Sequence, residues 1–191
     1  EREQRREAVQ YAPVTASRPH GDPQDVREAA RLLLAARAPV IVAGQGILYA
    51  EAWEELKELA ELIQVPVLTT LNGKSAFPED HPLALGTGGL SGTKMVDHFL
   101  RKADLVLGAG TSFTRSSFIV PIPPGKTMVQ VTISGEDINK DYPIAHGVIG
   151  DARAVLRQLQ EEVLRQAGPG GRRGESRVAA EVAAVKAEFL R

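Results

Sequence analysis

The chain has 191 residues, 43% of them hydrophobic, with a formal net charge of −1 and no cysteine. These values suit one compact globular domain and exclude disulfide bridges, thiolate metal sites and a cysteine nucleophile. A net charge near zero offers little attraction to nucleic acid or to an anionic membrane surface. The sequence also lacks a signal-peptide pattern and the roughly 20 apolar residues of a membrane helix. We therefore expect a cytoplasmic protein whose partners include neither nucleic acid nor membrane.

The N-terminal region is predicted to be an extended connection that leads into the first helix. Residues 11–24 carry three prolines and show no sustained periodicity, so we interpret residues 1–21 as an interdomain linker. Asp22 followed by Pro23 favours a helix start, with Asp22 as the N-cap and proline at the first helical position. Apolar residues then recur at helical spacing from Val26 to Leu34, which indicates a helix that covers a core.

The following 130 residues or so alternate between short apolar runs and amphipathic stretches. Strands are expected at 39–44, 65–70, 83–86, 104–109, 127–133 and 147–149, and helices at 50–63, at 94–102 and after an N-cap at Asp151. This alternation is typical of right-handed βαβ units on a parallel sheet. The predicted fold class is α/β, a three-layer open parallel sheet of five or six strands with helices on both faces, Rossmann-like, over a central domain of residues 22–167.

The C-terminal region begins with a glycine-rich break. Residues 168–175 contain four glycines and a proline, which predicts a hinge. The last segment has a helical pattern, and we expect it to be separate from the core and to point toward another domain. Residues 168–191 are therefore interpreted as a hinge and a helix that lead to a further C-terminal domain.

Gly44-Gln45-Gly46 follows the first predicted strand and raises the question of a dinucleotide site. The dinucleotide fingerprint needs a third small residue, where this chain has Tyr49, and an acidic residue at the end of the second strand, where it has Thr69 and Thr70. The pair of glycines is better explained as a tight strand-to-helix turn. An NAD dehydrogenase is disfavoured, and a nucleotide held in another way stays open.

Two further glycine clusters, 86–93 and 108–112, suggest a binding crevice. Loops after successive parallel strands gather at the carboxyl edge of the sheet, and small residues there let a flat or phosphorylated ligand approach the backbone. Tight turns alone would give the same composition. The candidate cofactor-binding residues are Gly44, Gly46, Gly86, Gly89, Ser91, Gly92, Thr93, Gly108, Ala109, Gly110, Thr111, Ser112 and Thr132.

No catalytic constellation or metal-ligand set is predicted in this chain. The four histidines, at 20, 81, 98 and 146, share no spacing that suggests a metal site. The serines at 112, 116 and 117 lack the G-x-S-x-G elbow of a serine hydrolase.

The order of several segments resembles the central domain of the thiamine diphosphate-dependent enzymes, especially the acetolactate synthase-like branch. The resemblance covers residues 20–165 and is carried by AARAPVIVAGQG, by PVLTTLNGKSAFPEDHP and by IGDAR. It implies a transferase or lyase that acts on a 2-oxo acid as a decarboxylase or carboligase. It also implies thiamine diphosphate and Mg²⁺ bound by pyrimidine- and diphosphate-binding domains on either side, in a homodimer or homotetramer. The segment alone is expected to be inactive.

Some members of that family hold FAD or an adenine nucleotide across the carboxyl edge of this domain. Here Gly110 stands where the family usually has an arginine, Thr132 and Ser134 replace two aspartates, and Ser91 replaces a histidine. Losing a guanidinium and carboxylates removes charge-assisted contacts, so FAD and ADP are possible but disfavoured.

Two alternative functions stay open from the sequence. The domain could retain an adenine-nucleotide, FAD or CoA site despite the missing charges. It could also be a free-standing NAD-using protein of related fold, such as a sirtuin-like deacylase, although the broken fingerprint disfavours this.

Overall fold

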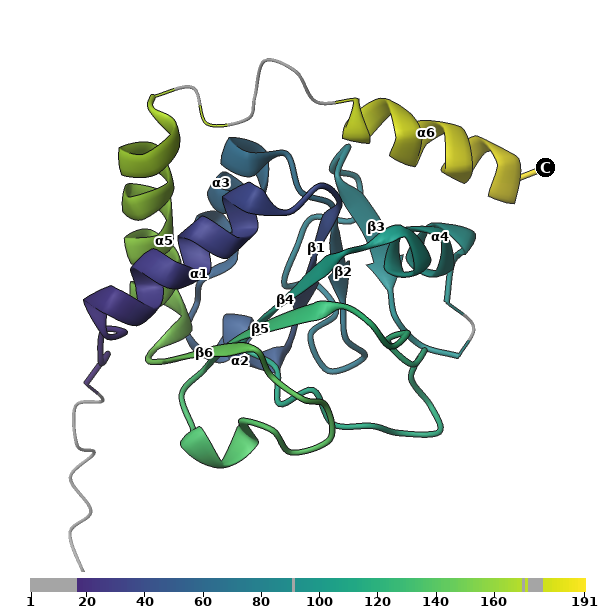
Figure 1. Ribbon diagram of the computed structural model, residues 1–191. Helices are drawn as coiled ribbons and strands as arrows, with labels where there is room; N and C mark the ends of the chain where they lie inside the picture. The colour runs from purple at the N-terminus through teal and green to yellow at the C-terminus, as the bar shows by residue number, and fades with distance from the viewer. Residues whose placement is uncertain (1–16, 91, 170, 172–176) are drawn as a thin grey trace, which may run out of the picture.

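The protein folds around a single parallel sheet of six strands in the order β3-β2-β1-β4-β5-β6 (Figure 1). This computed structural model describes residues 17–90, 92–169, 171 and 177–191. The strands are β1 (Pro39–Ala43), β2 (Val67–Thr69), β3 (Ala84–Thr87), β4 (Leu105–Ala109), β5 (Thr127–Thr132) and β6 (His146–Ile149). Every pairing is parallel, which confirms the predicted fold class. The order turns back between β1 and β4, the place where open α/β sheets usually bind ligands.

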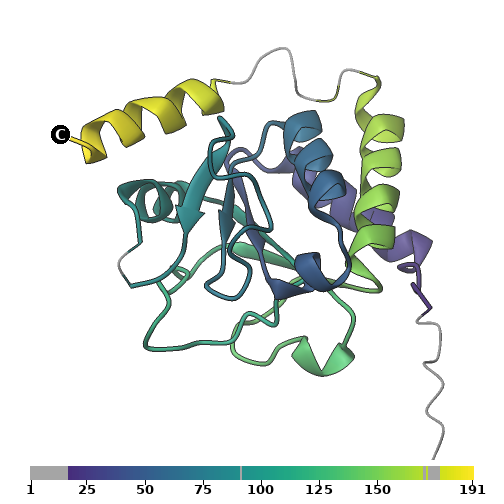
Figure 2. The same cartoon turned by 180° about the vertical axis from the view of Figure 1, so that it is seen from behind.

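Helices cover both faces of the sheet, as the alternating pattern predicted. The helices are α1 (Pro23–Ala35), α2 (Gln45–Tyr49), α3 (Trp53–Ile63), α4 (Lys94–Lys102), the 3-10 helix η1 (Gly135–Asp137), α5 (Ala152–Ala167) and α6 (Val178–Phe189). Helices α1, α3 and α5 share one face, and α4 and α6 lie on the other (Figure 1). The start of α1 and the end of α6 lie at opposite sides of the molecule, as Figure 2 also shows.

Strand β1 is apolar at every position because both of its faces are buried. In β1, Ile41 and Ala43 belong to the core beneath α1, α3 and α5, whereas Val40 and Val42 belong to the core beneath α4 and α6. Alternate side chains of a strand point to opposite faces, so a strand between two helical layers needs an uninterrupted apolar run.

The helix starts at Asp22 and Asp151 are confirmed. The Asp22 carboxylate accepts a hydrogen bond from the Gln24 amide at 2.8 Å, and the Asp151 carboxylate accepts one from the Ala154 amide at 3.1 Å. Each bond satisfies an amide that the first helical turn leaves without a partner.

Two helices differ from the expectation. The helix predicted over 50–63 is α3, and it begins later, at Trp53, because the chain first turns through Glu51, whose φ is +53°. The separate short helix α2 precedes the predicted range. The final helix was expected to be separate from the core, and this is wrong. Helix α6 packs on α4 through buried Val182 and Val185, and Glu181 accepts hydrogen bonds from Lys102 at 2.6 and 2.7 Å.

The interdomain roles of 1–21 and 168–191 stay predictions, since residues 1–16, 170 and 172–176 lie outside the described residues. Among the described helices, none combines the length and the apolar composition that crossing a bilayer requires.

Candidate binding cleft

A cleft of about 790 Å³ opens at the carboxyl edge of the sheet, where the strand order turns back. Its walls come from α2 and from the loops that follow β2, β4 and β5. The volume lies within the range of small-molecule sites, which is roughly 300 to 1,000 Å³. The cleft lies at the edge of the sheet where the glycine clusters predicted a crevice.

The structure places the predicted site residues in three groups. Some line the cleft: Gly46, Gly110, Thr111, Ser112 and Thr132. Others are near it in the chain but are not among its lining residues: Gly44, Gly86, Gly89, Gly92, Thr93, Gly108 and Ala109. Ser91 lies outside the described residues.

Gly44 and Gly46 serve backbone packing. The Gly44 amide donates to the Ala109 carbonyl oxygen at 2.9 Å, and the Gly46 amide donates to the Gly110 carbonyl oxygen at 2.8 Å. A Cβ at Gly46 would lie 2.8 Å from the Gly110 Cα, and one at Gly44 would collide with the Gly110 carbonyl. Both amides are therefore already used, so this geometry supports the tight-turn interpretation over a phosphate cradle.

Gly110 completes this close contact from the other side. Its φ is +61°, a left-handed conformation that favours glycine, and a Cβ there would lie 2.7 Å from the Ile47 amide nitrogen. The Gly110 amide is also occupied, because it donates to the Val131 carbonyl at 2.9 Å. The glycine clusters at 44–46 and 108–112 thus pack against and hydrogen-bond to each other at this edge.

Gly108 makes room for an aromatic ring. A Cβ at this position would collide with the ring of Phe113, which is buried and packs edge to face on Tyr142 at a centroid distance of 6.2 Å. Phe113 and Tyr142 both line the cleft. Gly108 therefore contributes to the cleft indirectly, by leaving space for the Phe113 ring that lines it.

The loop 86–93 is held by backbone pairing with the segment after β4. The Leu90 amide donates to the Phe118 carbonyl at 3.1 Å, and the Val120 amide donates to the Gly88 carbonyl at 3.1 Å. Thr93 caps α4 and its hydroxyl donates to the Leu85 carbonyl at 2.6 Å. Gly88 is the residue of this loop that the cleft includes among the described residues.

Asp137 is a cleft residue that the sequence reasoning missed. The chain has Thr132 and Ser134 where the family usually has two aspartates, but a different carboxylate, that of Asp137, lies in the cleft. Helix η1 turns the chain back so that the Thr132 hydroxyl donates to Asp137 Oδ2 at 3.1 Å, and Asp137 lines the cleft. Ser134 caps η1 by accepting from the Glu136 amide, so the S-x-x-D spacing was a signal for this turn.

Gln130 connects the two loops that carry Thr111 and Asp137. Its side chain is fully buried, and Nε2 donates to the Thr111 carbonyl at 2.9 Å and to the Asp137 carbonyl at 3.3 Å. Its Oε1 is buried without a hydrogen-bond partner. This residue fixes the spacing of the β4 and β5 loops, and nothing in its sequence context pointed to that role.

The cleft carries no basic side chain among its described lining residues, which include two carboxylates, Asp137 and Asp151. Its other polar side chains are hydroxyls and amides: Thr70, Thr111, Ser112, Thr114, Ser116, Thr132, Gln45 and Asn72, with the phenols of Tyr49 and Tyr142. Across the described part of the chain, no three histidine, aspartate or glutamate side chains come together as a metal site would need.

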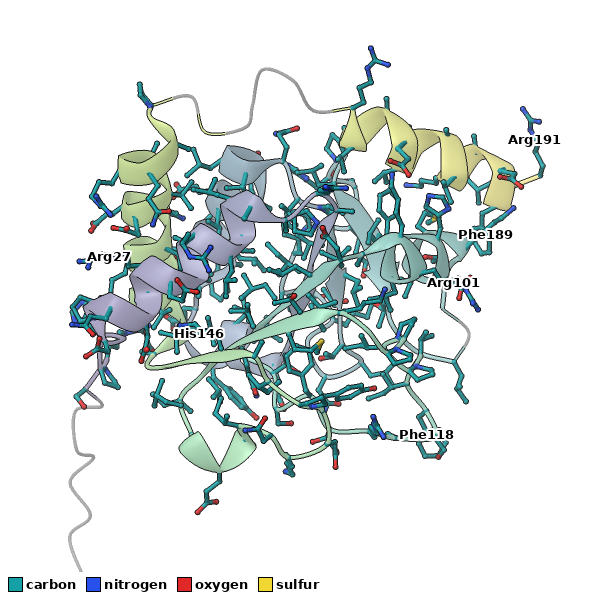
Figure 3. The ribbon with its side chains drawn as sticks, viewed as in Figure 1. Arg27, Arg101, Phe118, His146, Phe189 and Arg191 are labelled. Carbon is teal, nitrogen blue, oxygen red and sulfur yellow. The ribbon has the colours of Figure 1, made fainter. Side chains whose placement is uncertain are left out.

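Large apolar side chains surround this cleft and are open to solvent. Tyr49 is 77% exposed and Phe118 is 68% exposed, and Leu71 and Ile133 are also exposed. Figure 3 shows Phe118 at the periphery of the molecule, well away from α1 and α5. Such a cleft can offer ring faces and hydroxyl groups to a ligand.

The fold and the cleft define a Rossmann-like domain with a cleft at the carboxyl edge of its sheet. Residues 26–159 match the family described as "Thiamine pyrophosphate enzyme, central domain". The chain therefore belongs to the thiamine pyrophosphate (thiamine diphosphate) enzyme family, and the free-standing NAD-using alternative is not favoured.

Individual relatives agree with this membership. The chain is 37% identical over 157 residues to an acetolactate synthase of Mycobacterium bovis, covering 81% of this chain and 25% of that protein. It is 34% identical over 164 residues to a sulfoacetaldehyde acetyltransferase of Roseovarius nubinhibens, covering 83% and 27%. The crystal structure of benzoylformate decarboxylase from Polynucleobacter necessarius superposes with a TM-score of 0.67 at 26% identity, covering 83% and 30%. The chain thus spans about a quarter of the length of its relatives.

Proposed function

We propose that this chain is the central domain of a thiamine diphosphate-dependent enzyme of the acetolactate synthase type. The enzyme acts on a 2-oxo acid, which it decarboxylates or whose decarboxylated fragment it joins to an acceptor. The observation that carries the proposal is the match over residues 26–159 to the central domain of this family.

The described residues do not offer a site for the diphosphate or for Mg²⁺. The cleft has no basic side chain among its described lining residues, and no group of three metal-ligating side chains is present in the described part. The resemblance implies pyrimidine- and diphosphate-binding domains on either side of this domain in the same polypeptide, and we propose that these domains bind thiamine diphosphate and Mg²⁺. When bound, thiamine diphosphate supplies the carbon nucleophile that attacks the substrate carbonyl.

In this proposal the chain itself acts as a scaffold between the catalytic domains. Its sheet is buried on both faces and its helices are fixed by caps and ion pairs, which makes it a rigid spacer. We further propose a cytoplasmic homodimer or homotetramer, in which the loops at the carboxyl edge contribute to the substrate channel.

The reading frame around residues 1 and 191 tests the proposal. The product should have about 600 residues, because 157 aligned residues make up 25% of the Mycobacterium bovis relative. It should contain an activating glutamate before this segment and a Gly-Asp-Gly motif after it, and the purified product should consume pyruvate only with thiamine diphosphate and Mg²⁺. A product of about 190 residues, or pyruvate consumption without the cofactor, would contradict the proposal.

A further inference from the structure

We infer that the cleft selects an uncharged, hydroxyl-bearing ring compound and rejects the corresponding diphosphate. This inference does not rest on the proposed thiamine chemistry, because it concerns only the residues that line the cleft. It departs from FAD or ADP binding, which the resemblance implies for some relatives.

The first argument concerns the backbone amides that could hold a phosphate. The amides of Gly44, Gly46 and Gly110 each donate to a backbone carbonyl within the domain. Opening any of them to a ligand would break a bond between β1, β4 and β5 and leave a carbonyl without its donor. The glycine turn therefore provides no anion cradle of the kind that phosphate-binding loops use.

The second argument concerns charge. Asp137 and Asp151 line the cleft, and both repel a phosphate group. Two basic side chains that are not lining residues, Lys140 and Arg18, already form ion pairs with these carboxylates. Lys140 lies 4.0 Å from Asp137 and Arg18 lies 3.6 Å from Asp151.

Arg115 is a further basic group beside the cleft. Its guanidinium stacks over the ring of Tyr142 at 4.5 Å, and its backbone amide donates to Asp141. It is not among the lining residues. A diphosphate would therefore lose its hydration without gaining a charged partner.

The third argument concerns what the cleft does offer. Exposed Phe118 and Tyr49 present ring surfaces, on which a flat ring can stack. The Asp137 carboxylate and the hydroxyls of Thr111 and Ser112 can hydrogen-bond to sugar or ribityl hydroxyls. An acidic residue at the end of a strand is a common partner for such hydroxyls in Rossmann-type sites.

Matched pairs of probes test this selectivity. Calorimetry on the purified protein compares riboflavin with FMN and adenosine with ADP, so that the two members of each pair differ only in their phosphates. We expect the uncharged member to bind more tightly than its phosphorylated partner. Binding of FMN as tight as that of riboflavin or tighter, or of ADP as tight as that of adenosine or tighter, would overturn the charge argument. Failure of all four to bind at millimolar concentration would overturn the ligand class.

Two variants locate the effect in the cleft. Phe118→Ala should weaken riboflavin binding about tenfold through lost stacking, whereas Phe189→Ala, on α6 outside the cleft, should not change it. Ser112→Arg should strengthen ADP binding about tenfold through a new guanidinium–phosphate contact, and the exposed Ser117→Arg should not. Equal effects of a cleft variant and its control would contradict the assignment.

Discussion

Gly110 combines a positive φ with close backbone contacts at the carboxyl edge. Its φ is +61°, and a Cβ would lie 2.7 Å from Ile47 N and 2.8 Å from Gly46 C. A side chain there is therefore disfavoured both by conformation and by collision with backbone atoms, which cannot move as a flexible side chain can. A side chain at position 110 would therefore require the backbone of the turn formed by Gly44-Gln45-Gly46 to shift in this chain.

Alanine substitutions at Gly110 and Gly125 separate the cost of the left-handed conformation from the cost of the collision. Gly110→Ala should lower the free energy of unfolding by about 3 kcal/mol or more, since strain and collision add. Gly125→Ala is the control, because φ is +83° there but nothing lies within 4 Å of the added Cβ. It should cost only about 1 kcal/mol. Urea unfolding measures both, and equal losses would show that the contact with Gly46 and Ile47 is not tight.

Glu55, on α3, forms ion pairs with two arginines of α5. Its side chain is 5% exposed, and Oε1 accepts hydrogen bonds from Arg153 at 2.7 Å and from Arg157 at 3.0 Å. Burial by itself would raise the pKa of Glu55, but the hydrogen bonds from Arg153 and Arg157 hold it below its ordinary value. The folded state thus binds the Glu55 carboxyl proton more weakly than the unfolded state does. The interactions of Glu55 with the two arginines therefore stabilise the folded protein above pH 4.5.

Glu55→Gln should lower the free energy of unfolding by about 1 kcal/mol at pH 7, because both arginines are partly solvated. The difference from the wild-type protein should shrink as the pH falls below 4.5 and the native carboxylate becomes protonated. Chemical unfolding between pH 7 and pH 3 measures this. Glu58→Gln, at an exposed position, is the control. A stability difference between wild type and Glu55→Gln that grows toward low pH would contradict a lowered pKa of Glu55.

At the scale of elements, α6 depends on its contact with α4. The helix has 12 residues, and isolated helices shorter than roughly 12 to 15 residues are marginal in water. Buried Val182 and Val185, together with the ion pairs Lys102–Glu181 and Lys94–Glu188, provide the contact with α4. Docking on α4 therefore accounts for the helical state of this segment.

Val182→Asp should release α6, because it would bury a charge without a partner. Hydrogen exchange should then become faster across residues 178–189 while α1 and α5 keep their protection. Ala183→Asp, one residue along and exposed, is the matched control and should leave exchange unchanged. Equal protection of α6 in the two variants would contradict a docked helix.

Elements with strong local signals were predictable from the sequence, and elements fixed by tertiary contacts were not. The all-apolar β1 and the capped starts of α1 and α5 carry their information locally, in burial pattern and N-cap chemistry. Helix α2 has only five residues and no side-chain cap, so no local sequence feature predicted its bounds. The docking of α6 depends on a face of α4 that is distant in the chain.

The candidate site shows the same division. The sequence predicted that the loops after β1 and β4 would meet, because parallel strands bring their carboxyl ends to one edge. It did not predict that Gly46 and Gly110 would hydrogen-bond to each other, nor that η1 would bring Asp137 to Thr132. The Gly46–Gly110 contact depends on the distance between two loops, which residue types alone do not determine. The Thr132–Asp137 contact depends on the local turn at η1, for which the S-x-x-D spacing was the only sequence signal.

At the scale of the whole molecule, the chain is a parallel sheet between helical layers, and in the proposed enzyme the reactive groups belong to neighbouring domains. The six strands are enclosed by two helical layers (Figure 1). The chain spans about a quarter of the length of its acetolactate synthase relatives. The match to a central domain supports the proposed role of this chain as a scaffold.

Pyruvate turnover by the 191-residue chain, with thiamine diphosphate and Mg²⁺ added, tests this central claim most directly. The account predicts no release of carbon dioxide above the background of a heat-denatured sample, while circular dichroism shows the chain folded. Sustained, cofactor-dependent turnover by this chain alone would contradict it.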